Sequence, residues 1–144
     1  MDRLYTAEAT ATGARTGHVA SSDGRLDVQL SRPAEMAGDG GPGTNPEQLF
    51  AAGFAACFHS AMRFSLEPLG LSRSALEGSS VTAQVHFLRG EPGDFGLAVD
   101  LTGHLPQLDE EQARALMERT HTVCPYSRAT MGNVEVGLHV APAT

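Results

Sequence analysis

The chain has 144 residues, a formal net charge of −7 and ten basic residues, all of them arginine. An acidic chain is a poor electrostatic partner for phosphate backbones, so we expect no nucleic-acid partner. The lack of lysine excludes Schiff-base catalysis and the phosphate-binding loops that depend on lysine. The length fits one domain over residues 1–144, which buries enough surface to fold without disulfide staples.

The composition also predicts a compartment. Two cysteines are too few for a secreted disulfide scaffold, and no charged-then-apolar leader opens the chain. The longest apolar run, residues 49–58, is shorter than the roughly 20 residues that cross a bilayer. We therefore expect a cytoplasmic protein with no membrane partner.

The first part of the chain is predicted to form strands. Residues 4–12, 18–21 and 26–30 have β-tolerant or alternating patterns, and the last two flank a turn at residues 22–25. A loop rich in glycine and proline follows over residues 31–45.

A helix start follows this loop, and it can be capped in two ways. Thr44 as cap with Glu47 three residues later fits a capping box. Asn45 as cap with Pro46 at the first helical position fits equally well. The sequence leaves both arrangements open.

The helix over residues 49–58 is apolar on every side, which is typical of a helix buried all round. One small sheet covers only one face of a helix, and small side chains allow a second helix to approach closely. We therefore infer a homo-oligomer with this helix near its centre. The small residues are Ala51, Ala52, Gly53, Ala55 and Ala56.

The second half alternates strands and helices. Residues 81–89 and 97–105 form a predicted hairpin, and residues 109–121 have the spacing of an amphipathic helix. A short helix over residues 125–131 and a strand over 134–140 complete the chain. The predicted class is α+β.

Two cysteines 67 positions apart are the minimum for a self-contained redox cycle, in which one thiol is oxidised and the other resolves it. Cys124 precedes Pro125 and a predicted helix, whose unpaired N–H groups stabilise a thiolate. Cys57 lies in the apolar helix, where burial without a cation leaves a thiol inert. Local context therefore favours Cys124 as the nucleophile, although a buried, inert cysteine remains an alternative for each.

Two segments resemble a known family. NPEQLFAAGFAAC at residues 45–57 and VCPYS at 123–127 closely resemble the signature segments of the organic hydroperoxide resistance proteins, the Ohr branch of the Ohr/OsmC superfamily. Residues 5–10, 13–17 and 21–24 also look like that branch.

The resemblance implies a cysteine-based thiol peroxidase without haem, flavin, selenium or metal. By their positions in the motifs, Cys57 is the peroxidatic cysteine and Cys124 the resolving one, which reverses the order that local context favours. Arg15 matches the arginine that stabilises the thiolate, because guanidinium stays charged and presents a planar fork. Glu47 matches the carboxylate that holds this arginine.

Each of these two polar residues also has a simpler interpretation. Arg15 fits a solvated arginine at a strand end, and Glu47 fits a pure capping residue. In an unbroken helix Glu47 lies about 15 Å along the axis from Cys57. Either Arg15 spans this distance, or the helix begins after Glu47.

The family pattern implies an OsmC-like fold, in which an intertwined homodimer has long central helices between two antiparallel sheets. The active site is expected at the dimer interface, lined by Phe50 and Phe54. Phe54 stands where the family often has tyrosine. Arg128 and Met131 depart from the family pattern beside the resolving cysteine.

The implied reaction reduces alkyl or fatty-acyl hydroperoxides to alcohols through Cys57 sulfenic acid and a Cys57–Cys124 disulfide. A dithiol, such as a lipoylated protein, then reduces this disulfide. One alternative is an OsmC-type peroxidase with another substrate preference, and a second is a non-catalytic module that binds a hydrophobic ligand. His121 and His59 lie near the cysteines in sequence but supply too few ligands for zinc, so we expect no metal.

Overall fold

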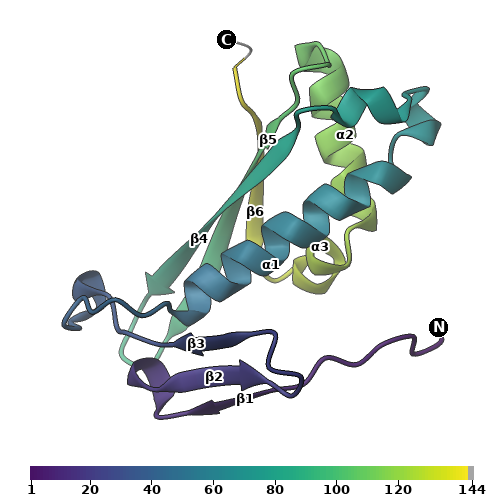
Figure 1. Ribbon diagram of the computed structural model, residues 1–144. Coiled ribbons are helices and arrows are strands. Elements are labelled where there is room, and N and C mark those ends of the chain that lie inside the picture. The colour runs from purple at the N-terminus through teal and green to yellow at the C-terminus, as the bar shows by residue number, and fades with distance from the viewer. Residues whose placement is uncertain (143–144) are drawn as a thin grey trace. The chain divides into compact units, whose positions relative to one another are not determined.

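The first half of the chain contains a small antiparallel sheet. The structure, a computed structural model, describes residues 1–142, and the chain divides into two compact units, Met1–Leu49 and the part from Phe50 onward. In the first unit β1 (Ala9–Thr12), β2 (His18–Ser21) and β3 (Asp27–Gln29) pair in the order β1-β2-β3 (Figure 1). Each predicted strand is present, but the first is shorter than expected.

The second unit contains the other three-stranded sheet. Here β4 (Ser80–Arg89) and β5 (Phe95–His104) form the predicted hairpin, and β6 (Glu135–Val140) pairs with β5. The β5–β6 pair is parallel, so the expectation that both sheets would be antiparallel is corrected for this pair. The reason is the long helical connection between these strands, which returns the chain to the same end of the sheet.

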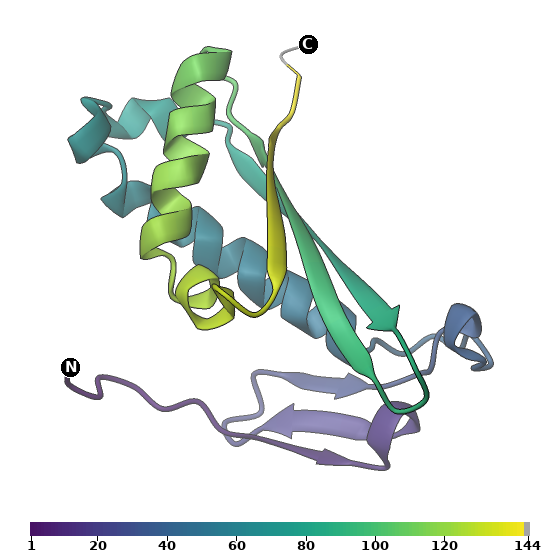
Figure 2. The ribbon, with the colours of Figure 1, turned by 180° about the vertical axis from the view of Figure 1, so that it is seen from behind.

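Within residues 1–142 three α-helices accompany the sheets, and the predicted α+β class is confirmed. They are α1 (Pro46–Ala61), α2 (Glu110–Val123) and α3 (Pro125–Thr130). The part of α1 from Phe50 onward and α2 lie on the same side of the β4–β5–β6 sheet (Figure 2).

The start of α1 decides between the two predicted caps. Asn45 Oδ1 accepts a hydrogen bond of 2.8 Å from the backbone N–H of Gln48, and Pro46 occupies the first helical position. The Thr44 hydroxyl instead donates to the Gln48 side chain at 2.8 Å. The Asn45 cap is therefore confirmed and the Thr44–Glu47 capping box is wrong, which leaves the Glu47 carboxylate available for another partner.

One face of α1 supplies much of the core of the second unit. Phe54, Phe58 and Ala61 are buried, whereas Ala52 and Ala56 on the opposite face are exposed. Within a single chain, α1 is therefore buried on one face only. The buried core also includes Val99, Leu101, Leu116 and Met117.

No helix among residues 1–142 combines the length and the apolar character needed to cross a membrane.

A carboxylate shared by two histidines ties the three strands of the second sheet together. Asp100 on β5 accepts hydrogen bonds from His86 on β4 at 2.9 Å and from His139 on β6 at 2.7 Å. Gly137 lies opposite Asp100, and a Cβ at that position would lie 2.4 Å from Asp100 Oδ1. The missing side chain at Gly137 makes room for the contact. The two histidines hold the pKa of the Asp100 carboxyl below its usual value, with His139 acting most strongly.

This cluster predicts a pH-dependent effect of Asp100→Asn. A carboxyl whose pKa is lower in the folded protein stabilises it above the unfolded pKa of about 3.9, and this contribution is lost as pH falls through the folded pKa. We expect Asp100→Asn to lower the urea midpoint at pH 6 and to have a smaller effect at pH 3. Glu135→Gln, on the exposed face of the same sheet, is the control. A loss that stays constant between pH 6 and pH 3 would contradict the assignment.

Candidate active site

The structure brings together the two thiols, which lie 67 positions apart in the sequence. Cys57 lies in the fourth turn of α1, and Cys124 is the residue at which α2 ends and α3 begins. Their sulfur atoms are 3.7 Å apart, with the Cys124 thiol donating to Cys57. A disulfide bond is about 2.0 Å long, so a small movement of the two side chains would join them.

The two thiols differ in their surroundings. Cys124 is completely buried, whereas Cys57 is partly exposed. Burial raises the pKa of the Cys57 thiol, and the backbone N–H of Tyr126 acts in the opposite direction. Tyr126 lies in the first turn of α3. The sequence suggested that the N–H groups at the start of α3 would stabilise a Cys124 thiolate. One of them, the Tyr126 N–H, instead acts on Cys57, because the packing of α1 brings the Cys57 sulfur to the start of α3.

An aromatic cluster stands beside the thiols. The ring centroids of Phe50, Phe54 and Tyr126 lie 5.8 to 6.2 Å apart. Phe54 is fully buried, whereas the Tyr126 side chain is 40% exposed. Phe54 thus forms the buried side of the cluster, and Tyr126 contributes solvent-accessible surface to it. Sequence reasoning named Phe50 and Phe54 and missed Tyr126, for which the only signal is its place two residues after Cys124.

A bidentate ion pair lies in the first unit. Arg15 Nη1 and Nη2 donate to the two carboxylate oxygens of Glu47 at 2.8 and 2.6 Å. Both side chains are largely shielded from solvent, with exposed fractions of 24% for Arg15 and 15% for Glu47. The hydrogen bond holds the pKa of the Glu47 carboxyl below its usual value and raises the pKa of the Arg15 guanidinium. Both groups are therefore charged at neutral pH.

Two glycines shape the loop that presents Arg15. This residue lies in a short 3-10 turn, Ala14–Thr16, between β1 and β2. A Cβ at Gly17 would lie 1.7 Å from the carbonyl oxygen of Thr12, and Gly13 adopts a φ of +72°. Only glycine fits such a turn without strain.

The ion pair resolves part of the ambiguity about Glu47. Its carboxylate binds Arg15, so Glu47 is more than a capping residue. Because α1 begins at Pro46, the alternative that the helix starts after Glu47 is wrong. The Arg15–Glu47 pair belongs to the first unit, and the thiol pair belongs to the second.

The two residues near Cys124 that depart from the family pattern are exposed to solvent. Arg128 and Met131, which depart from the family pattern, are exposed on and after α3. No group of three or more histidine, cysteine, aspartate or glutamate side chains in residues 1–142 has an arrangement that could hold a metal ion.

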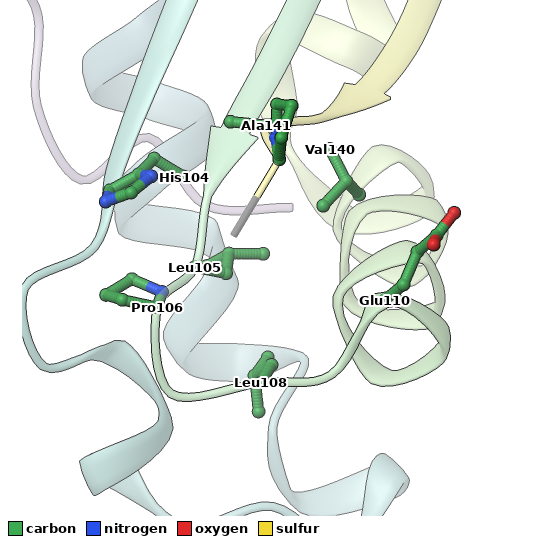
Figure 3. A pocket seen from close by; sticks show the side chains of 8 residues that line it. His104, Leu105, Pro106, Leu108, Glu110, Val140 and Ala141 are labelled. Atoms are coloured by element: carbon green, nitrogen blue, oxygen red, sulfur yellow. The ribbon is translucent and has the colours of Figure 1, made fainter. Parts of the chain in front are cut away.

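A separate cavity of about 480 Å³ lies at the opposite end of α2. Glu110 opens this helix and borders the cavity together with His104 and Leu105, as Figure 3 shows. Cys124 follows the last residue of α2, about 20 Å away along the helix axis. The thiols are therefore not part of this cavity.

Comparisons with known proteins establish the family. Residues 38–139 match the family model for OsmC-like proteins. An organic hydroperoxide resistance protein of Xanthomonas axonopodis pv. citri is 48% identical over 141 residues, covering 96% of this chain and 95% of the relative. The chain belongs to the organic hydroperoxide resistance branch of the OsmC-like family. OhrB of Bacillus subtilis, another organic hydroperoxide resistance protein, is 43% identical over 95% of this chain and 98% of its own length.

Solved structures place this OsmC-like chain in the same fold. The organic hydroperoxide resistance protein of Legionella pneumophila superposes with a TM-score of 0.88 at 45% identity, covering 98% of this chain and all of its own. The crystal structure of Bacillus subtilis OhrB gives a TM-score of 0.84 at 41% identity, over 96% of this chain and all of its own. The OsmC-like fold expected from the motifs is therefore confirmed.

The unequal burial of the thiols in this OsmC-like protein predicts their order of modification. In the reduced protein a bulky maleimide should label Cys57 well before Cys124, because Cys124 has no exposed surface. Peptide mass spectrometry after short exposure measures the order. Labelling of both thiols at equal rates in 6 M urea is the control, and preferential labelling of Cys124 in the native protein would contradict the described packing.

Proposed function

We propose that the chain reduces organic hydroperoxides to alcohols through a disulfide cycle between Cys57 and Cys124. The observation that carries this proposal is the 3.7 Å separation of the two sulfur atoms. The names of relatives at 43 to 48% identity support the substrate class. A solved relative from Vibrio cholerae, 42% identical, has captopril in one of its active sites, which supports access of an organic molecule to such a site.

The proposed cycle begins with the Cys57 thiolate. It attacks the distal oxygen of the hydroperoxide, an S–O bond forms, the O–O bond breaks, and the alkoxide leaves as alcohol after taking up a proton. The Cys124 sulfur then attacks the Cys57 sulfenic acid, so that the S–S bond forms and the S–O bond breaks. Hydroxide leaves with the proton of the Cys124 thiol as water. Two thiols are oxidised, and one peroxide is reduced to alcohol and water.

Arg15 is proposed as the cation that favours the Cys57 thiolate, with Glu47 orienting the guanidinium. The fork geometry of their ion pair supports this role, because it leaves little freedom to the arginine head group. Since burial raises the pKa of Cys57, a nearby cation is the physical means of restoring its nucleophilicity.

The preference for organic peroxides is proposed to come from the aromatic cluster beside the thiols. An alkyl tail that buries apolar surface gains about 25 cal/mol per Å², and hydrogen peroxide has no such tail. Phe50 and Tyr126 offer the partly exposed surface of this cluster.

The reductant is proposed to be a dihydrolipoyl group on a protein, acting in the reducing cytoplasm. A disulfide cycle needs an external dithiol after each turnover, and thiols are kept reduced in that compartment. Turnover with dihydrolipoamide should exceed turnover with thioredoxin at equal concentration. Faster turnover with thioredoxin would overturn this part of the proposal.

The active form is proposed to be a homodimer. Within one chain Ala52 and Ala56 leave an exposed strip on α1, and Phe64 and Phe95 are 78% and 59% exposed. Surface of this kind is typical of an interface. Sedimentation should give twice the chain mass of 15.1 kDa, and a stable monomer at micromolar concentration would contradict the dimer.

Cysteine variants test the proposed cycle. We expect Cys57→Ser to abolish thiol oxidation by cumene hydroperoxide, because the first bond to oxygen can no longer form. Cys124→Ser should still react once and stop at a sulfenic acid that dimedone traps. Stopped-flow measurement of peroxide loss and mass spectrometry follow both variants. Turnover retained by Cys57→Ser, or no thiol loss in the unmodified protein, would refute the proposal and favour a ligand-binding module.

Removal of Arg15 tests the proposed cation. We expect Arg15→Ala to raise the pKa of Cys57 and to slow its alkylation at neutral pH, because less of the thiol is then present as thiolate. The pH profile of Cys57 alkylation measures this shift. Arg63→Ala removes an exposed arginine elsewhere and should leave the profile unchanged. An identical profile in Arg15→Ala and in the unmodified protein would rule out the role.

A further inference from the structure

Gly53 occupies a position in the middle of α1 where glycine is unfavourable. Glycine inside a helix costs roughly a kilocalorie per mole relative to alanine, so a structural reason for it is expected. A Cβ at Gly53 would lie 3.0 Å from Tyr126 Oη and 3.1 Å from Tyr126 Cε2, which is tighter than ordinary packing allows. The glycine therefore lets the Tyr126 ring lie directly on the helix backbone.

The contact with Gly53 places the Tyr126 ring one helical turn from Cys57, the proposed nucleophile. Gly53 precedes Cys57 by four residues, so the two positions share one face of α1. The backbone N–H of Tyr126 lowers the pKa of the Cys57 thiol. One residue thus acts on the thiol through its backbone and lies along the same helix face through its ring.

Two phenylalanines fix the ring in this place. Its centroid lies 5.8 Å from that of Phe54 in an edge-on arrangement and 6.2 Å from that of Phe50. Phe54 is completely buried, whereas Tyr126 keeps 40% of its side chain exposed. The Tyr126 ring is therefore held against α1 one turn before Cys57, with part of the residue open to solvent.

We propose that Tyr126, seated on Gly53, is the specificity-determining side chain that makes Cys57 react faster with organic hydroperoxides than with hydrogen peroxide. This inference rests on the proposed peroxidase function. The ring packs against the alkyl or aryl part of the substrate while the thiolate attacks its distal oxygen. Hydrogen peroxide has no such part and gains nothing from the ring.

The test compares rate constants for oxidation of Cys57 by cumene hydroperoxide and by hydrogen peroxide, measured by stopped flow on the full-length protein. We expect Tyr126→Ala to slow the reaction with cumene hydroperoxide about tenfold and to change the reaction with hydrogen peroxide less than about threefold. Tyr126→Phe keeps the ring and should keep the ratio of the two rate constants. Leu88→Ala removes an exposed apolar side chain elsewhere in the same unit and should also keep it.

Gly53→Ala tests the seat without removing the ring. Alanine is the better helix former, so the helix itself is not weakened, but its methyl group pushes the Tyr126 ring away from the backbone. We expect the ratio of rate constants to fall in this variant as well. It also carries the test if Tyr126→Ala does not fold.

Three outcomes would overturn the inference. These are an unchanged ratio in Tyr126→Ala and Gly53→Ala, an equal slowing of both peroxides in Tyr126→Ala, or an equal loss of selectivity in Leu88→Ala. Failure of the proposed function gives a different result, because then neither peroxide oxidises Cys57 in the unmodified protein.

Discussion

Close packing of α1 against the junction of α2 and α3 brings two sulfur atoms from distant parts of the chain to 3.7 Å. Phe54 and Phe58 on α1 and Leu116 and Met117 on α2 belong to one buried core, so this junction is built from the same contacts that stabilise the second unit. Protein interiors are close-packed and of low compressibility. The separation of the sulfurs is therefore a property of the core, and the proposed chemistry requires only a small further movement of two side chains.

The first turn of α1 shows how a capping choice prepares a polar site. Asn45 satisfies an unpaired N–H at the helix start, so the neighbouring Glu47 is not needed as a cap. Its carboxylate instead forms two hydrogen bonds with Arg15 from a glycine-bounded turn. Had Thr44 and Glu47 formed the capping box, the same carboxylate would have been directed to the helix backbone and the arginine would have lost this partner.

Local sequence rules predicted most elements, and the two cysteines suggested a thiol pair, but the family motif rather than local context selected Cys57. The β4–β5 hairpin and the helix α2 follow from periodicity alone, because their patterns are long and regular. The direction of β6 did not follow, since it depends on the path of the connection before it. The Asp100 cluster was also missed, because cross-strand contacts require a register that no local pattern supplies.

The choice of nucleophile between the two cysteines illustrates the limit of local reasoning most clearly. A helix start beside Cys124 is visible in the sequence, but the Tyr126 N–H at that start acts on Cys57, which belongs to another helix. Gly53 likewise looks like one small residue among several in an apolar run. Only the structure shows that a Cβ there would lie 3.0 Å from Tyr126 Oη, which distinguishes it from the alanines around it. Both features depend on tertiary packing, and the family motif carried the assignment where periodicity could not.

Peptide mapping of the reduced protein after mixing with one equivalent of cumene hydroperoxide tests the disulfide cycle most directly. We expect one peroxide to convert both thiols of a chain into a single crosslinked peptide pair joining Cys57 and Cys124. Intact thiols after complete mixing, or oxidation confined to Cys124 while Cys57 remains reduced, would contradict it.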